Sequence, residues 1–129
     1  MATATKNSDP LLALVLLGAA AALPAAAQDV AHGKALFDVQ CARCHAVKRG
    51  SDEVYGPSLR GVVGRKAAKQ KGFDYSAAMR KSAIIWDWAS LNAYLAEPRL
   101  VIPRTSMPGF GVPDPDDRRD LIAYLQSLH

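Results

Sequence analysis

Two cysteines that are two residues apart and followed at once by a histidine constrain this chain more than any other feature. They form the run Cys41-Ala42-Arg43-Cys44-His45, and the chain has no further cysteine. A C-x-x-C-H run is the signature of covalent haem attachment. The two thiols can add to the two vinyl groups of a haem, and the histidine is then carried under the ring, where its imidazole can bind iron. We therefore expect one short helical turn that supplies two tethers and one axial ligand.

Three other roles are compatible with this cysteine pair. The pair could form a structural disulfide if the chain is exported to an oxidising compartment. It could be a thioredoxin-like redox pair, but no strand pattern surrounds it to build the required βαβ unit. It could supply half of a zinc site, but zinc usually takes four ligands and the chain lacks a third cysteine. Haem attachment is favoured because the rest of the chain supports it.

The first 27 residues have the pattern of a cleavable signal peptide. Lys6 precedes an apolar run over residues 11–23, and Ala25-Ala26-Ala27 offers the small residues that a signal peptidase needs. The alternative is a retained anchor helix, since residues 10–27 carry no charge, but that stretch is short and rich in alanine. We expect cleavage after the last of these alanines and export, most simply to a bacterial periplasm.

Residues 28–129 would then form one small domain. Removing Lys6 and Asp9 leaves 15 basic and 11 acidic side chains, so the net charge stays at +4. A charge this modest on an exported protein argues against nucleic acid as a partner. A domain of 102 residues buries only a modest core of its own, and a covalently held porphyrin would add a large apolar body to it.

Capping residues and apolar spacing predict an all-α domain of helices joined by long loops. Four residues suit helix N-caps: Asp29, Ser76, Asp87 and Asp114. The first helix should run to about Gln40, with Gly33 and Phe37 on a face where glycine lets another helix approach closely. The third should end at Ala96 with Trp88 on its apolar side, whereas we expect residues 46–72 to be loop-like and residues 97–115 to be extended.

A haem iron bound by His45 needs a ligand on its other side. Met107 lies in a proline-rich loop 62 residues after His45, which is enough chain to reach the far face of a haem. A thioether sulfur favours reduced iron and raises the reduction potential. Met79 lies in a helix-like stretch and fits better as a packing residue. His32 and His129 are further candidates, but the first lies on the helix next to the proximal ligand and the second is terminal.

With these residues in place, residues 28–129 resemble the class I cytochrome c family, close to its mitochondrial and α-proteobacterial type. The spacing matches from residue 33 to residue 125. The matching stretches are Gly33-x-x-x-Phe37-x-x-x-Cys41-x-x-Cys44-His45; Gly56-Pro57-x-Leu59; Gly72-Phe73-x-Tyr75-Ser76; Trp86; Tyr94-Leu95-x-x-Pro98; Ile102-Pro103-x-Thr105-x-Met107; and Arg118-x-Asp120-Leu121-Ile122-Ala123-Tyr124-Leu125. The resemblance implies the class I cytochrome c fold, with helices and loops wrapped around one covalently bound haem.

The resemblance also implies a role for individual residues. Cys41 and Cys44 would hold one haem c (heme c). His45 and Met107 would bind its iron. The haem propionates would accept hydrogen bonds from four residues, which suits buried carboxylates that need donors or a cation: Arg65, Tyr75, Trp86 and Thr105.

Two further residues would support the iron ligands by resemblance: the Pro57 carbonyl would orient His45, and Tyr94 would lie near the Met107 sulfur. Gly33 and Phe37 would cross the last helix near Leu121 and Tyr124.

The chain departs from the family pattern at four places around the ligands. Arg104 stands where the pattern has glycine, so a positive φ there would cost about 1 kcal/mol or more. Ser106 replaces a lysine, and Met79 replaces an asparagine that holds a buried water. Pro108-Gly109-Phe110 shifts the aromatic residue that follows the methionine by one place.

The function that this resemblance implies is electron transfer without catalysis. We expect a soluble, monomeric periplasmic carrier that takes one electron from a donor such as a cytochrome bc1 complex. It would pass the electron to a terminal oxidase, a reductase or a photosynthetic reaction centre. Basic residues near the exposed haem edge would meet an acidic partner: Lys48, Lys66, Lys69, Lys71 and Arg99.

Three alternatives remain open from the sequence. The chain could be an electron-accepting subunit of one periplasmic dehydrogenase. It could be a haem enzyme or gas-binding protein with a labile sixth ligand. The third alternative is a binding module without haem.

Overall fold

The computed structural model describes residues 1–2, 27–48, 55–109 and 111–129. Within these residues the chain forms the helices α1 (Val30–Gln40), α2 (Ala77–Lys81), α3 (Trp88–Ala96), α4 (Pro98–Val101) and α5 (Pro115–Gln126). The same residues contain no β-strand, only an isolated antiparallel bridge between Lys66 and Ile85. The predicted all-α architecture is confirmed. Almost all of the predicted signal peptide, and Phe110, lie outside the described residues.

The four predicted helix starts are confirmed by their capping hydrogen bonds. In each case the side chain accepts a hydrogen bond from a backbone N–H of the first turn: Asp29, Ser76, Asp87 and Asp114. The α3 cap is reciprocal, since the Ser90 hydroxyl also accepts from the Asp87 N–H. In α5, Pro115 occupies the first helical position, which needs no N–H donor.

Two details of the prediction are wrong. Residues 98–101 form the short helix α4 instead of extended chain, because Pro98 both ends α3 and fits the first position of a new helix. Trp88, expected on the apolar side of α3, is 45% exposed. The buried face of α3 consists of Leu91 and Tyr94 instead, and Trp88 lies in the first turn of the helix, at its solvent-exposed end.

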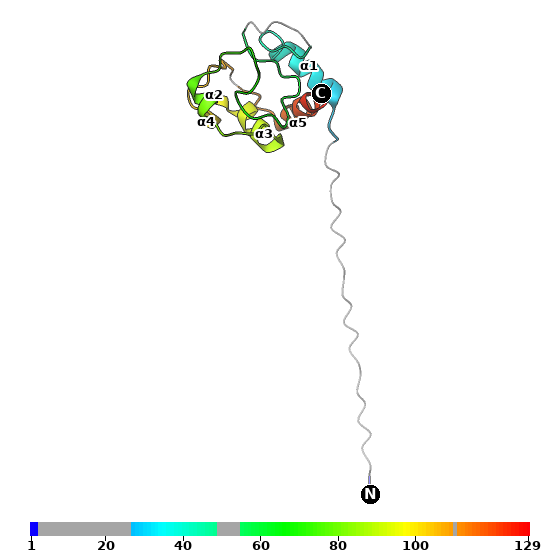
Figure 1. Ribbon diagram of the computed structural model, residues 1–129. Helices are drawn as coiled ribbons and strands as arrows, with labels where there is room; N and C mark the ends of the chain where they lie inside the picture. Colours follow the sequence, from blue (N-terminus) through cyan, green and yellow to red (C-terminus); the bar gives the residue numbers. More distant parts are fainter. Residues whose placement is uncertain (3–26, 49–54, 110) are drawn as a thin grey trace.

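Helices α1 and α5 lie side by side at one end of the domain, with the C-terminus beside them (Figure 1). The close approach depends on Gly33, because a Cβ there would lie 2.0 Å from the carbonyl oxygen of Asp120. One turn later, the rings of Phe37 and Tyr124 pack with centroids 5.5 Å apart. Leu121 is also fully buried, so the crossing expected from the first-helix glycine is confirmed.

A polar network closes the edge of this crossing. Asp120 is a buried residue, 4% exposed. Its carboxylate lies 3.0 Å from His32 Nδ1 and accepts hydrogen bonds from the Asp29 N–H and from Arg119 Nε. Burial alone would raise the pKa of Asp120, but these hydrogen bonds hold it below its ordinary value. The pKa of His32 is raised, first by the hydrogen bond to Asp120 and then by nearby carboxylates, including that of Asp117.

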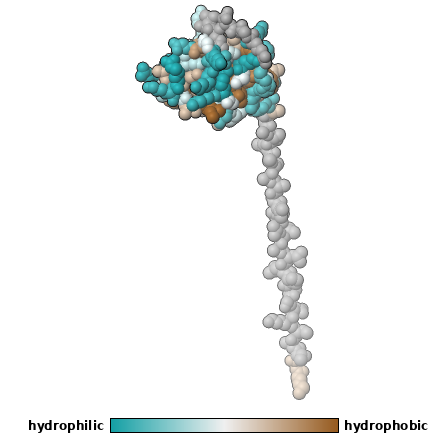
Figure 2. Space-filling model, viewed as in Figure 1, coloured by the Kyte–Doolittle hydropathy of each residue, from teal (hydrophilic) through white to brown (hydrophobic). Residues whose placement is uncertain are grey.

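The opposite side of the domain is built mainly from loops, with α2 and α4 at its edge (Figure 1). Residues 64–67 are tied to residues 84–86 by three backbone hydrogen bonds: Gly64 N to Trp86 O at 2.7 Å, Trp86 N to Arg65 O at 3.0 Å and Ala67 N to Ile84 O at 2.8 Å. The face in Figure 2 is dominated by hydrophilic side chains. Among the described residues, none of the helices combines the length and apolarity needed to span a membrane.

Candidate functional site

One cavity of about 580 Å³ contains the candidate site. All eight residues predicted to bind a haem or its iron line this cavity: Cys41, Cys44, His45, Arg65, Tyr75, Trp86, Thr105 and Met107. They come from segments spread over most of the described chain, and apolar core residues complete the walls. Leu91 from α3 and Leu121 from α5 are among them. The volume and the mostly apolar lining are those of a site for one small organic molecule.

The turn that carries the cysteines continues directly from α1. The Cys41 N–H donates to Phe37 O, and the N–H groups of Cys44 and His45 both donate to Cys41 O. This confirms the expected helical turn, which puts Cys41, Cys44 and His45 in one wall of the cavity. Both cysteines are free thiols, so the disulfide alternative is not observed. Burial, with a smaller contribution from Cys44, raises the pKa of the Cys41 thiol to about 11.

The His45 ring is fixed by the turn at Gly56 and Pro57. Its Nδ1 lies 2.8 Å from the carbonyl oxygen of Pro57, as the resemblance implied. A carbonyl oxygen can only accept, so this bond requires the tautomer with the proton on Nδ1 and the lone pair on Nε2. A Cβ at Gly56 would lie 2.8 Å from Cε1 of the ring. Glycine is therefore needed before Pro57 for the carbonyl to reach the imidazole.

A buried hydrogen bond between Tyr94 and Thr105 holds the chain next to Met107. The Tyr94 hydroxyl lies 2.8 Å from Thr105 Oγ1, and the Met107 N–H is 3.4 Å from the same oxygen. Burial raises the pKa of Tyr94, although the hydrogen bond to Thr105 opposes that shift. Tyr94 therefore fixes the chain two residues before Met107, and both side chains line the cavity.

Arg104 adopts a positive φ of 67° just before this hydrogen bond. The condition for strain at this position is therefore met, because an L-residue with a long side chain is disfavoured there by about 1 kcal/mol. Just before Met107, the chain therefore combines a strained residue, Arg104, with the buried Tyr94–Thr105 hydrogen bond.

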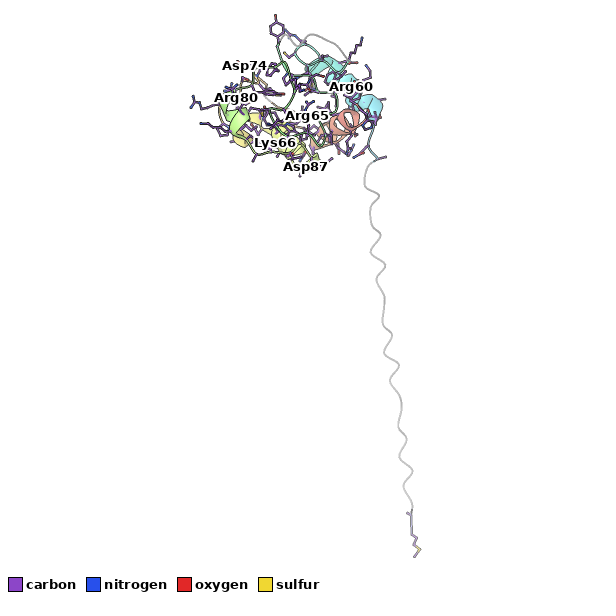
Figure 3. All side chains as sticks on the ribbon, viewed as in Figure 1. Arg60, Arg65, Lys66, Asp74, Arg80 and Asp87 are labelled. Atoms are coloured by element: carbon purple, nitrogen blue, oxygen red, sulfur yellow. The ribbon has the colours of Figure 1, made fainter. Side chains whose placement is uncertain are left out.

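Three of the predicted propionate partners that line the cavity are Arg65, Tyr75 and Trp86. The Arg65 guanidinium donates to Gln70 Oε1 at 2.7 Å and to the carbonyl oxygen of Ser58 at 2.8 Å. In Figure 3 it lies toward the middle of the domain, whereas Arg80 and Asp74, which form an ion pair, lie near one edge. Trp86 is buried and Tyr75 is partly buried.

Of the other candidate iron ligands, His32, His129 and Met79, only Met79 lines the cavity. His32 is paired with Asp120 at the helix crossing, and neither His32 nor His129 lines the cavity. Met79 does line it, from α2. No group of three or more His, Cys, Asp or Glu side chains within the described ranges could hold a metal ion, so nothing there completes a zinc site.

Sequence reasoning missed the contacts of one arginine that holds the chain a few residues after Met107. Arg118, in the first half of α5, donates to Asn92 Oδ1 in α3 and to the carbonyl oxygens of Val112 and Pro113. In the sequence it stands out only as part of the matching pattern at the last helix. Its partner Asn92 is 26 positions away, so no local signal in the sequence identifies this contact.

The residues of the cavity fit a covalently attached haem. The cavity offers two thiols, an imidazole with its tautomer fixed, and a thioether, in a mostly apolar wall that also contains Arg43 and Arg65. This is the soft and imidazole donor set that suits haem iron. Arg65 would supply the cation that buried carboxylates need.

Comparison with known proteins points to one family. The family model described as cytochrome c matches residues 30–129. Cytochrome c of Guizotia abyssinica is 41% identical over 103 residues, which is 80% of this chain and 93% of that protein. Cytochrome c2 of Rhodopila globiformis is 44% identical over 100 residues, or 78% and 93% of the two chains. Cytochrome c2 of Rhodomicrobium vannielii is 42% identical over 104 residues, or 81% and 82%. The chain belongs to the cytochrome c family, whose members are electron carriers with the class I all-α fold and one covalently attached haem c.

Proposed function

We propose that this cytochrome c carries single electrons through a haem held by Cys41 and Cys44, with His45 and Met107 as the iron ligands. The observation that carries the proposal is that all eight expected residues line one cavity, although they come from segments far apart in the chain. The oriented imidazole supports it further, because the Pro57 carbonyl selects the tautomer that can bind a metal through Nε2.

The residues of the chain have three tasks in this mechanism. When bound, the haem supplies one-electron redox chemistry at its iron. Pro57 and the Tyr94–Thr105 pair keep His45 and the Met107 segment in fixed positions, so little reorganises when the charge changes. Apolar walls around Leu91 exclude water. Arg65, Tyr75, Trp86 and Thr105 would bind the propionates.

We place the carrier in a bacterial periplasm, reached through the signal peptide of residues 1–27, with residues 28–129 as the mature domain. Its donor would be a cytochrome bc1 complex or a similar protein, and its acceptor a terminal oxidase, a reductase or a reaction centre. The basic residues proposed for docking are all exposed: Lys48, Lys66, Lys69, Lys71 and Arg99. Lys66 also lines the cavity, which supports a basic rim at the site.

Substitution of the two cavity methionines tests the ligation. Met107→Ala should abolish the weak far-red band that reports iron–sulfur coordination and should permit carbon monoxide binding. It should also lower the reduction potential by on the order of 100 mV or more, since axial ligands tune haem potentials over about 0.8 V. Met79→Ala is the matched control, because Met79 lines the same cavity. If Met79→Ala loses the band and Met107→Ala keeps it, the assignment is wrong.

Salt dependence tests the docking surface. Charge steers encounter more than it adds affinity, and screening shortens to about 3 Å at 1 M salt. Reduction by a bc1-type donor should therefore slow markedly as ionic strength rises, and Lys69→Glu should slow it at low salt without changing the haem spectrum. A rate that salt leaves unchanged, in the wild type and in Lys69→Glu, would show that this face does not steer.

One observation favours a second candidate, a haem protein with a labile sixth ligand that binds a gas or peroxide. The positive φ of Arg104 strains the segment that presents Met107. Carbon monoxide binding to the reduced wild-type protein at neutral pH would favour this candidate, whereas a wild type that excludes carbon monoxide would favour the carrier.

A further inference from the structure

Residues 102–109 and 111–113, here called the Met107 loop, are attached to α3 at both ends. Near the start, the Thr105 N–H donates to Ile102 O, and the Thr105 hydroxyl is bonded to Tyr94 of α3. Near the end, the Val112 N–H donates to Leu95 O at 2.7 Å. Gly111 passes so close to α3 that a Cβ there would lie 2.2 Å from Ala96 O. The position of Met107 therefore depends on how firmly the two ends are held.

At the second end, the Arg118 side chain of α5 adds further hydrogen bonds to the loop. Arg118 Nη1 donates to Val112 O at 2.7 Å and to Pro113 O at 2.8 Å. Its Nε donates to Asn92 Oδ1 at 2.8 Å. One guanidinium thus joins the loop, α3 and α5, and its planar fork allows these directions to be satisfied at once.

The acceptors show why this arginine is not simply a surface charge. All three are neutral oxygens, and Val112 is only 6% exposed, so its carbonyl could not easily turn to water if the guanidinium were lost. The neighbouring Arg119 differs, because it forms ion pairs with Asp116 and Asp120 on its own helix. Two adjacent arginines therefore serve different regions, the Met107 loop and the α1–α5 crossing.

We propose that Arg118, oriented by Asn92, is a positioning residue for Met107: it fastens the end of the Met107 loop to α3 and α5 and so keeps the sulfur at the iron. This inference rests on the proposed ligation by Met107. Loss of the fastening raises the fraction of molecules in which the sulfur has left the sixth position. A competing ligand such as imidazole then binds with an apparent affinity that rises in proportion to that fraction.

The experiment compares the same conservative change at the two adjacent arginines in the oxidised holoprotein. Arg118→Lys keeps the charge and removes the planar fork. It should weaken the far-red band and bind imidazole about tenfold more tightly than the wild type, which corresponds to a tenfold larger open fraction. Arg119→Lys is the matched control and should bind imidazole like the wild type. Asn92→Ala should shift the affinity in the same direction as Arg118→Lys, by about threefold.

Each outcome decides the question. Wild-type imidazole affinity in both Arg118→Lys and Asn92→Ala overturns the proposal, and so does an equal shift in Arg119→Lys, which would indicate general loosening. If Arg118→Lys does not fold, Asn92→Ala decides alone. Met107→Ala separates the two proposals: if it loses the band while Arg118→Lys is unchanged, only the positioning role fails, whereas a band that survives Met107→Ala overturns the ligation and the positioning role together.

Discussion

The α1–α5 crossing and the Met107 loop both hold distant parts of the chain together, but by different physical means. At the crossing, backbone meets backbone at Gly33, and Leu121 beside it is only 1% exposed. In the Met107 loop, Met107 is only partly buried and the neighbouring Ser106 and Pro108 are exposed. Discrete hydrogen bonds from Tyr94 and Arg118 hold that loop.

The difference shows that one small domain can combine a rigidly packed region with a loop that is able to open locally. Close packing fails sharply when an atom is added, because neither helix can move without opening the core. A hydrogen-bonded loop fails in steps, one bond at a time, and the rest of the domain persists. The proposed iron ligand Met107 therefore lies in the region that can open locally. The α1–α5 crossing, which closes the domain, lies in the closely packed region.

The largest expected effect is that of Gly33→Ala at the crossing. Helix propensity alone would stabilise the protein by about 1 kcal/mol, since alanine replaces glycine in a helix. We expect the opposite, a loss of about 3 kcal/mol, because the new Cβ would meet the Asp120 carbonyl at 2.0 Å. Denaturant unfolding of the holoprotein measures it, with Ala35→Gly on the exposed side of α1 as the control for propensity. A stabilised Gly33→Ala would contradict the described close approach.

The same tyrosine-to-phenylalanine change can be made in both regions. Tyr94→Phe should lower the free energy of unfolding by about 1 to 2 kcal/mol, because Thr105, 9% exposed, loses its buried hydrogen-bond partner. Tyr124→Phe at the crossing should change it less, since the described residues give its hydroxyl no hydrogen bond while its ring packs on Phe37. Equal effects in the two variants would erase the distinction between a packed region and a hydrogen-bonded one.

Removal of the backbone strain at Arg104 should stabilise the Met107 loop. Arg104→Gly removes the cost of a positive φ at a non-glycine residue, so we expect a gain of about 1 kcal/mol. The greater freedom of glycine in the unfolded chain opposes part of that gain. Chemical denaturation gives the stability, and the imidazole affinity of the same variant should fall if strain weakens the hold on Met107. A destabilised variant would mean that the arginine side chain makes a compensating contact.

The smallest effect concerns pH and the His32–Asp120 pair. Because the folded-state pKa of His32 is raised above its ordinary value of 6.5, protonated His32 stabilises the fold below that pH. The contribution is lost as the pH rises through the raised pKa. Asp120 acts in the opposite sense: its lowered pKa gives stability that is present above its ordinary value of 3.8 and disappears at more acidic pH.

The charges around His32 are those of Asp29, Asp117, Asp120 and Arg119. The free energy of unfolding is measured at about pH 5 and at about pH 8. Between these two values, the wild type should lose more stability than the His32→Gln variant does. The measured quantity is the difference between the two proteins, which cancels other titrating groups. Identical pH dependence in both would show that the pair contributes no charge-dependent stability.

Much of the fold was predictable because its determinants are local. Asp29, Ser76, Asp87 and Asp114 each cap a helix through atoms two or three residues away, so single-sequence reasoning placed all four starts correctly. The helix α4 was missed because Pro98 is compatible both with the end of one helix and with the start of the next. The exposure of Trp88 was missed because propensity does not show which part of an apolar face the neighbouring helices cover.

The site was predictable only where residue spacing carries chemistry. The Cys41–His45 turn is recognisable from its own pattern. Strain at Arg104, where the resemblance implies glycine, was expected only on condition of a positive φ, and the structure shows that φ. His32 was considered as an iron ligand, whereas the fold pairs it with Asp120, 88 positions away. Long-range polar pairs of this kind leave no periodic signal, so the sequence could not reveal them.

The crossing of α1 and α5 also sets the order in which events can occur during synthesis. The Asp29 N–H and the Asp120 carboxylate that accepts from it are 91 positions apart. Closing a loop of that length costs about 4 kcal/mol in chain entropy, and no part of the contact forms until α5 has been made. Until then, the turn with Cys41 and Cys44 follows a helix that has nothing to pack on. Chain elongation thus delays the docking of α1 until α5 has been synthesised, whereas the cysteine turn that continues from α1 is complete much earlier.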